Sequence, residues 1–216
     1  MIGFNVEREP VIREVKARLS EKRFEHTLGV CNMAEHICSY CLPEDREEVF
    51  FAALLHDIAK ELTECELKDI LAKEGITLTE ADALPVLHSY AAPYIVKRDF
   101  PELATPKILS AVEKHTVGDA CMSVFDEIIF LADYIERGRS YRDCIETREF
   151  MLSSLVKGDT EACVNALHKA CVMSMDLTCN KLLERGIAVR PEGRPSCSPV
   201  LQALITRLCL NNHPPA

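Results

Sequence analysis

The chain has no long hydrophobic stretch, no excess of basic residues and no second C-x-x-C pair. Its longest apolar run, Val49–Leu55, is seven residues long. A membrane-spanning helix needs roughly 20 apolar residues. The charged residues Glu7, Arg8 and Glu9 stand where a signal peptide would carry its apolar segment. We therefore expect no membrane segment and no export by a signal peptide.

The charge balance limits the partners of the protein. Lys and Arg number 25 against 34 Asp and Glu, which gives a net charge of −9. Long nucleic acids are bound through clusters of Lys and Arg. The sequence therefore argues against nucleic-acid binding. A small anionic ligand is still compatible with it, provided that the residues around that ligand are basic.

The cysteines match neither a disulfide scaffold nor a zinc ribbon. There are 11 among 216 residues, an odd number and a share below that of disulfide-rich proteins. Cys38 and Cys41 form the one close C-x-x-C pair, and this pair lies within a helical pattern. We expect reduced, buried cysteines in a cytoplasmic protein, with a redox role for this pair as the alternative.

The pattern of apolar residues predicts an all-α fold. No segment alternates apolar and polar residues over the length of a strand, whereas helical spacing recurs along most of the chain. Ser123 is an expected N-cap, with Glu127 near the capping-box position. We predict helices at about residues 10–19, 24–40, 44–61, 64–73, 87–98, 108–114, 123–138, 145–156 and 160–184.

The composition changes after Gly186. Residues 190–199 contain three prolines and one glycine, which favours irregular structure. We expect one helical domain over residues 1–186. Over residues 187–216 we expect an irregular arm with a short helix at Pro199–Leu210.

His56 and Asp57 form the strongest local signal for chemistry. They are adjacent polar residues directly after the apolar run Phe50–Leu55. Burying two such side chains is costly unless a partner satisfies them. A metal ion is one such partner, because imidazole nitrogen and carboxylate oxygen are both good ligands. The alternative is a solvated helix end.

Two further residues fit the same chemistry. His26 lies 30 residues before His56, on the preceding predicted helix. Asp133 lies 76 residues after Asp57 in an otherwise apolar helix, where an unpaired carboxylate is expensive. The alternative for Asp133 is a salt bridge to Arg137, one helical turn further on.

Taken together, these residues resemble the H…HD…D signature of the HD-domain metal-dependent phosphohydrolases. The resemblance is closer still to the YqeK-type symmetrical bis(5'-nucleosyl)-tetraphosphatases, and it covers about residues 8–186. Five separate blocks carry it in order: Arg23–Val30, Ala52–Glu61, Leu87–His88, His115–Thr116 and Ile128–Glu136.

This resemblance implies an HD-domain helical bundle and an enzymatic function. The reaction implied is the symmetric hydrolysis of diadenosine tetraphosphate to two ADP by a metal-activated water. The metal implied is iron, as one or two ions, and mixed His and Asp ligands also suit manganese or another divalent metal. The partner implied is a dinucleoside polyphosphate, and a homodimer is compatible with the resemblance.

The resemblance also assigns roles to particular residues. The metal ligands it implies are His26, His56, Asp57 and Asp133. The catalytic residues it implies are Asp57, Lys60, His88 and His115, where His88 and His115 would face the phosphates or support a second metal. The phosphate-binding residues it implies are Arg23, Asp57, Lys60, His88, His115, Asp133 and Arg139.

Three of these assignments have structural alternatives. Lys60 would otherwise be a solvated lysine paired with Glu64. Arg139 would otherwise be a surface arginine instead of a bidentate phosphate clamp. His115, at the end of a predicted helix, would otherwise be a surface histidine stabilised by the helix dipole.

Two other functions stay open. One is another HD phosphohydrolase that acts on a nucleotide or an alarmone. The other is a nucleotide-binding regulatory module without turnover. The complete H…HD…D set argues against the second, because a sensor need not keep every metal ligand.

Overall fold

The structure is a computed structural model of the chain and describes residues 6–78, 84–119 and 121–184. These residues form nine α-helices, two short 3₁₀ helices and no strand, which confirms the predicted all-α fold. The elements are α1 (Arg8–Arg18), α2 (Glu21–Cys41), η1 (Pro43–Asp45), α3 (Arg46–Leu55), α4 (Glu64–Lys73), α5 (Leu84–Asp99), η2 (Pro101–Leu103), α6 (Pro106–Lys114), α7 (Val124–Ile135), α8 (Arg142–Ser153) and α9 (Thr160–Glu184).

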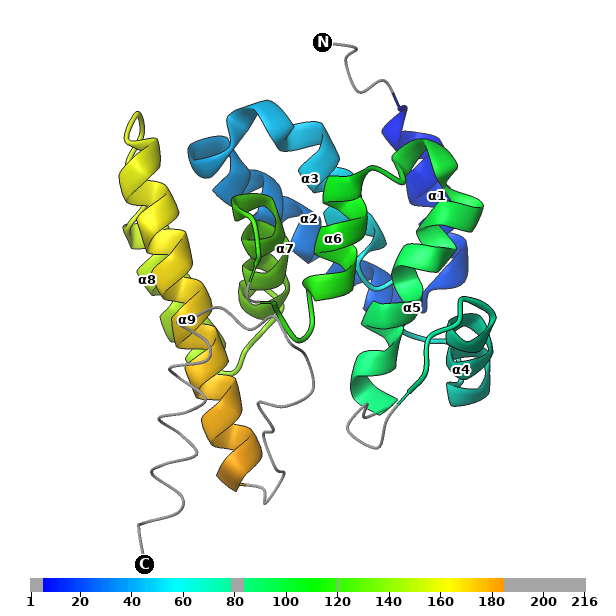
Figure 1. Cartoon of the computed structure of the whole chain (residues 1–216). Helices are drawn as coiled ribbons and strands as arrows, with labels where there is room; N and C mark the ends of the chain where they lie inside the picture. Colours follow the sequence, from blue (N-terminus) through cyan, green and yellow to red (C-terminus); the bar gives the residue numbers. More distant parts are fainter. Residues whose placement is uncertain (1–5, 79–83, 120, 185–216) are drawn as a thin grey trace, which may run out of the picture.

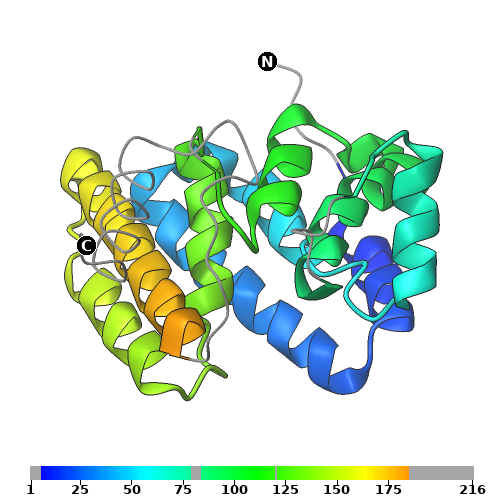
Figure 2. The same cartoon turned by 60° about the horizontal axis from the view of Figure 1, so that its bottom comes forward.

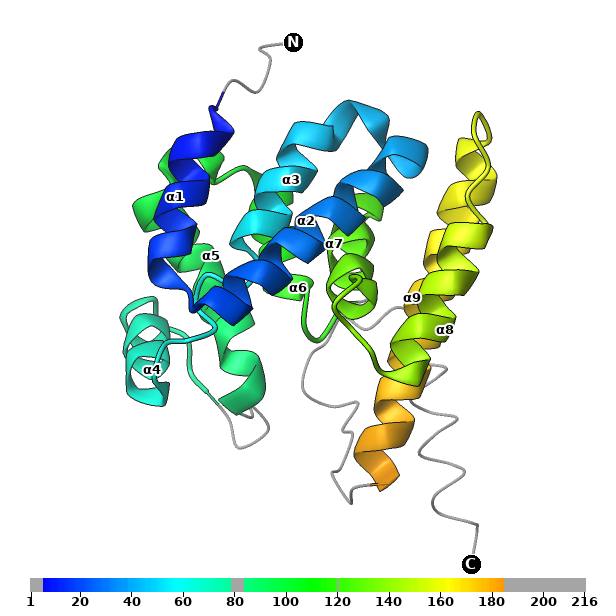
Figure 3. The same ribbon diagram turned by 180° about the vertical axis from the view of Figure 1, so that it is seen from behind.

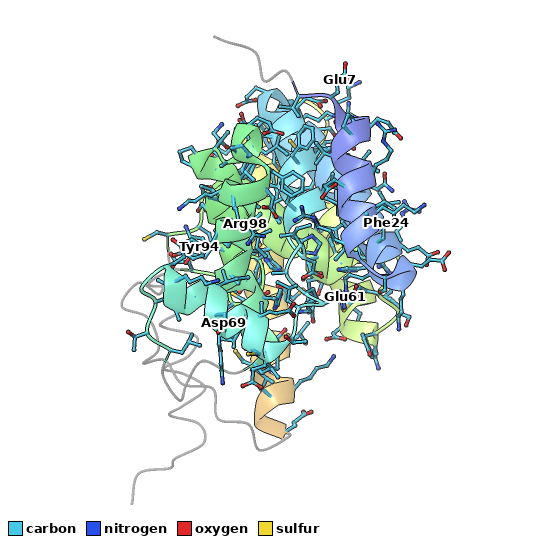
Figure 4. All side chains as sticks on the ribbon, turned by 90° about the vertical axis from the view of Figure 1, so that its right-hand side faces the viewer. Glu7, Phe24, Glu61, Asp69, Tyr94 and Arg98 are labelled. Carbon is cyan, nitrogen blue, oxygen red and sulfur yellow. The ribbon has the colours of Figure 1, made fainter. Side chains whose placement is uncertain are left out.

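The helices fall into three groups that lie side by side (Figure 1). Helices α2, α3, α6 and α7 form the middle, with α1, α4 and α5 at one end and the pair α8 and α9 at the other. Figure 2 shows the same division from below. The view from behind shows α2 running diagonally across the middle, where it packs against α3, α7 and α9 (Figure 3). In Figure 4 the end with α1, α4 and α5 faces the viewer, and Asp69 and Arg98 are labelled on it.

Two buried helices deliver polar residues to the middle of the fold. All residues from Val49 to Leu55 in α3 are buried, and so are those from Phe125 to Ala132 in α7. His56 and Asp57 directly follow the first run, and Asp133 directly follows the second. Packing of the apolar residues therefore fixes where these polar side chains lie.

The predicted helix over residues 44–61 is too long. Its first residues form η1, and α3 ends at Leu55. After that point the backbone tightens into successive turns, in which Ile58 N–H donates to Leu55 O and Lys60 N–H donates to Asp57 O, each three residues back. His56 and Asp57 therefore lie on turns at the end of α3 instead of inside a continuous helix.

The start of α7 also differs in detail from the prediction. Ser123 is the N-cap, as expected, but its capping-box partner is Asp126 and not Glu127. A capping box needs the acidic residue three positions after the cap, and Glu127 is one position too far. Glu127 is instead buried against α9, where its carboxylate lies 2.6 Å from Nδ1 of His168.

The cysteines in the described residues are all free. Cys38 and Cys41 are both buried, and burial raises the pKa of each thiol to about 12. Redox chemistry uses the thiolate, which a high pKa disfavours. The redox alternative for this pair therefore has no support in the structure.

Two further predictions concern a membrane segment and the C-terminal arm. Among the described residues, no helix combines the length and apolarity that crossing a membrane requires. The predicted arm and helix over residues 187–216 lie outside the described residues.

Candidate metal and phosphate site

Six of the predicted site residues lie together where the central helices meet α5. They come from α2 (His26), the end of α3 (His56 and Asp57), α5 (His88), the end of α6 (His115) and α7 (Asp133). Neighbouring imidazole rings are in edge contact, with centroids 5.6 Å apart for His26 and His56, 5.0 Å for His56 and His115, and 5.1 Å for His88 and His115. The structure thus brings together residues that are more than 100 positions apart in the chain.

Asp57 lies between two pairs of imidazoles. Its Oδ2 is 3.4 Å from Nε2 of His56 and 3.8 Å from Nε2 of His26. Its Oδ1 is 3.3 Å from Nε2 of His88 and 3.5 Å from Nε2 of His115. The two oxygens of one carboxylate therefore face two different halves of the cluster.

Asp133 completes the first half. Its Oδ1 lies 3.0 Å from Nε2 of His26 and 4.0 Å from Nε2 of His56. The salt-bridge partner of Asp133 is Arg139, whose Nη2 donates to Oδ1 at 2.7 Å and whose Nε donates to the backbone oxygen of Asp133 at 3.1 Å. The alternative pair with Arg137 is therefore wrong.

Two imidazole rings of the cluster, those of His56 and His115, are oriented by backbone carbonyls at the ring edge that is turned away from the cluster. Nδ1 of His56 lies 2.6 Å from Ala53 O, and Nδ1 of His115 lies 2.7 Å from Val112 O. A carbonyl oxygen only accepts, so Nδ1 carries a proton in both rings, and Nε2 is the ring nitrogen that faces the cluster.

The donor set fits a divalent cation. Nε2 of His26 and Nε2 of His56 are buried and make no hydrogen bond, although carboxylate oxygens surround them. A cation placed between such ring nitrogens and the carboxylates would satisfy both. Within the described residues, three triads have ligand atoms within 4.8 Å of one another: His26/His56/Asp57, His56/His115/Asp133 and Asp57/His88/His115.

The carboxylates of this cluster stay ionised. Burial by itself raises the pKa of Asp57, but the imidazole of His56 and hydrogen bonds from the other rings outweigh it, so the pKa lies well below its usual value. Burial likewise raises the pKa of Asp133, and His26, His56 and Arg139 outweigh that effect. Both groups are therefore ready to act as charged ligands.

His88 and His115 belong to the same cluster. Both are buried, with 2% of each residue exposed. His88 lies within α5, and His115 follows the last residue of α6. The alternative of a surface histidine at position 115 is therefore wrong.

Lys60 is directed at the second half of the cluster. Its Nζ lies 3.1 Å from Nε2 of His88. Burial lowers the pKa of Lys60, and it outweighs the opposing effect of the Asp57 and Asp133 carboxylates; Arg23 and Arg139 add smaller effects that lower this pKa. Glu64, the alternative partner, instead pairs with Lys68 on α4. Lys60 is thus a half-buried ammonium next to the predicted metal ligands.

Two arginines lie at the edge of the cluster. Arg23 Nη1 donates to Oδ2 of Asp57 at 2.8 Å, and Arg139 binds Asp133. About a third of each guanidinium side chain is exposed, 29% for Arg23 and 34% for Arg139. Neither is a free surface arginine, and both can be reached from solvent.

Two residues of the site, Thr116 and Glu136, have no role predicted from the sequence. Thr116 Oγ1 lies 3.1 Å from Nε2 of His88 and 2.9 Å from Nε2 of His115. Glu136 Oε1 lies 3.2 Å from Nδ1 of His26. Their place in the sequence could have indicated a role, since Thr116 follows His115 and Glu136 lies three residues after Asp133.

This fold and this cluster of histidines and aspartates define a known class of proteins. Residues 23–138 match the HD domain family, and this range contains all six residues of the cluster: His26, His56, Asp57, His88, His115 and Asp133. The chain belongs to the HD domain family.

Two bacterial proteins are similar to this chain over most of its described residues. A Bacillus subtilis (strain 168) protein named "Bis(5'-nucleosyl)-tetraphosphatase, symmetrical" is 33% identical over 149 residues, which are 68% of this chain and 79% of the relative. A Halalkalibacterium halodurans protein of the same name is 31% identical over 138 residues, covering 62% of this chain and 71% of the relative.

A solved structure has the same fold. It is described as a predicted HD superfamily hydrolase involved in NAD metabolism from Clostridium acetobutylicum. The TM-score is 0.75 at 28% identity, and the alignment covers 94% of this chain and 98% of the other.

Proposed function

We propose that the protein is a metal-dependent phosphoanhydride hydrolase that converts diadenosine tetraphosphate symmetrically into two ADP. The observation that carries this proposal is the meeting of His26, His56, Asp57 and Asp133, with two buried Nε2 atoms that have no hydrogen bond. The names of the relatives support the substrate, because two of them are symmetrical bis(5'-nucleosyl)-tetraphosphatases.

The cluster contains two sets of candidate ligands that share Asp57. We propose that a first divalent ion is held by His26, His56, Asp57 and Asp133, and a second by Asp57, His88 and His115. Asp57 would belong to both because its two oxygens face different imidazole pairs. Mixed imidazole and carboxylate ligands suit iron or manganese, and we propose iron. Such an ion supplies acidity to a water molecule and neutralises charge on the phosphoryl oxygens.

The protonation state of His88 supports the second ligand set. Burial lowers the pKa of His88, and Lys60 and His115 add to that effect while Asp57 opposes it. The ring is therefore neutral at neutral pH, which is the form of imidazole that binds a metal ion. The hydroxyl of Thr116 lies next to the same ring nitrogen, 3.1 Å from Nε2 of His88.

We propose that Arg23, Lys60 and Arg139 bind the polyphosphate chain. Each contacts a residue of the metal-binding cluster, so each lies near the position of the reacting phosphate. A guanidinium can hold two phosphate oxygens at once, whereas Lys60 offers a point charge. Phosphoryl transfer needs little covalent help from the protein, so positioning and charge are the main contributions of these residues.

Product analysis tests this proposal. Purified protein is incubated anaerobically with Fe²⁺ or Mn²⁺ and diadenosine tetraphosphate, and the nucleotides are separated by anion exchange. ADP as the sole product supports the symmetric reaction, and AMP plus ATP contradicts it. A parallel panel holds a nucleoside monophosphate and an alarmone. Faster cleavage of one of these supports the other HD phosphohydrolase, and tight nucleotide binding without any cleavage supports a regulatory module.

The organisation of the chain is part of the same proposal. We propose that residues 1–186 form the catalytic domain and that 187–216 are an appended arm, because the described helices, α1 to α9, pack against one another. We also propose a cytoplasmic location, since the nine cysteines of the described residues are free thiols. The homodimer stays a prediction, which sedimentation of the purified protein checks.

A further inference from the structure

Glu136 is a buried carboxylate that the proposed chemistry does not use. Its side chain is only 5% exposed, and its Oε1 lies 3.2 Å from Nδ1 of His26. The rings of His56 and His115 have a backbone carbonyl at the equivalent position. His26 therefore differs from both, because an acidic side chain directly after α7 faces the edge of its ring that is turned away from the cluster.

The geometry excludes Glu136 as a ligand of the first ion. The atom of His26 that faces Asp57 and Asp133 is Nε2, whereas Glu136 contacts Nδ1 on the other edge. The contact instead resembles the support that metal-binding histidines commonly receive, in which the second ring nitrogen donates to a carboxylate. Such a partner fixes the tautomer and raises the basicity of the ligand nitrogen.

Two glycines leave the space that the Glu136 carboxylate occupies. A Cβ atom at Gly29 of α2 would lie 2.6 Å from Oε2 of Glu136, and one at Gly138 would lie 3.0 Å from both oxygens. Gly29 needs no unusual backbone angle, and glycine in a helix is less favourable than alanine by about 1 kcal/mol. The close approach of Glu136 therefore explains a glycine at this position.

The second oxygen of Glu136 and its backbone are also held. Gly138 N–H donates to Oε2 at 2.5 Å. From α8, Arg148 donates to the backbone oxygens of Ile135 at 3.0 Å and of Glu136 at 2.7 Å. Both carboxylate oxygens of Glu136 and the backbone around it are thus held by hydrogen bonds. A residue that must orient another side chain precisely needs such support.

We propose that Glu136 is the positioning residue of His26: it holds the ring with the proton on Nδ1 and with Nε2 directed at the first metal ion, and Gly29 provides the space for it. This inference rests on the proposed function only for the presence of that ion. The hydrogen bond itself is a property of the metal-free protein.

Three variants and one control test it. Glu136→Gln keeps the shape but leaves one of the two donors, His26 Nδ1–H or Gly138 N–H, facing an NH₂ group. Glu136→Ala removes the acceptor, and Gly29→Ala places an atom 2.6 Å from Oε2 and so displaces the carboxylate. Glu25→Ala is the matched control, because Glu25 is an exposed carboxylate next to His26 on the same helix.

The first readout is the tautomer of His26 in metal-free protein, from the ¹⁵N shifts of its ring. Burial lowers the pKa of this ring, but Asp133 and Glu136 outweigh it and raise the pKa, so the pH is increased until the ¹⁵N shifts show the neutral ring, and the tautomer is determined there. Wild type and Glu25→Ala should show the Nδ1–H form, whereas Glu136→Gln and Glu136→Ala should shift toward Nε2–H. An unchanged tautomer in both Glu136 variants overturns the inference.

The second readout is Mn²⁺ affinity without nucleotide. Glu136→Ala and Gly29→Ala should bind the first ion about 10- to 100-fold more weakly than wild type, the usual loss when such a supporting contact is removed. Adding Gly29→Ala to Glu136→Ala should cost nothing further, because both act through one contact. Full additivity overturns the role of Gly29.

These results separate this inference from the proposed function. Wild type that binds no Mn²⁺ refutes the proposed metal site, whereas wild-type affinity in Glu136→Ala refutes the positioning role alone. Melting curves of the metal-free variants verify that each is folded. If Glu136→Ala does not fold, Glu136→Gln and Gly29→Ala still decide the question.

Discussion

Replacing Asp57 by Asn is expected to weaken metal binding at both proposed ion sites, because an NH₂ group takes the place of one carboxylate oxygen. The substitution keeps the size of the side chain and removes its negative charge. Each Asp57 oxygen faces a different imidazole pair, so both ligand sets lose their shared carboxylate. Loss of a mere supporting contact costs about 10- to 100-fold in metal affinity. Applied to both ions, this gives a combined loss of at least about 10²- to 10⁴-fold, or about 3–5.5 kcal/mol.

Metal binding and turnover are measured on the same preparation. Equilibrium dialysis with elemental analysis gives the bound ions, and anion exchange gives the ADP formed from diadenosine tetraphosphate. Asp69→Asn is the matched control, because Asp69 is exposed on α4 (Figure 4). Helicity by circular dichroism should be nearly unchanged in both variants. If Asp57→Asn keeps two ions at wild-type affinity and full turnover, the shared-carboxylate arrangement is wrong.

Two further predictions concern a cation of the site and an ion pair far from it. Lys60→Met should lower kcat/KM for diadenosine tetraphosphate by about 10- to 100-fold, the value of one charged hydrogen bond, with unchanged bound metal. Lys68→Met, at an exposed lysine of α4, is the control, and equal kinetics in the two variants would contradict phosphate binding by Lys60. Asp99→Asn should lower the free energy of unfolding at pH 6 by at most about 1 kcal/mol. Hydrogen bonds from Arg98 and Arg18 lower the pKa of Asp99 from 3.8 to about 2, so this stabilisation is present above pH 3.8 and is lost as the pH falls toward 2. Urea unfolding at pH 6 and pH 3 checks this, and an equal difference at both values would refute it.

The sequence by itself determined the fold class, and it singled out the residues that the structure brings together as candidate metal ligands. Helical spacing of apolar residues is a local property, so the helices could be predicted from it. His56, Asp57 and Asp133 stood out because polar groups at the end of an apolar run, or within an apolar helix, need a partner. The end of α3 was missed, because a helix that tightens into turns keeps the same apolar spacing for several residues.

Tertiary structure alone decided how these residues meet. It selected Arg139 over Arg137 as the partner of Asp133, and it divided the two oxygens of Asp57 between two imidazole pairs. It also placed Glu136 against His26, 110 residues away in the chain. Spacing along a helix says which residues share a face, but such contacts depend on how helices from distant parts of the chain pack, and no local pattern encodes a distance between atoms on different helices.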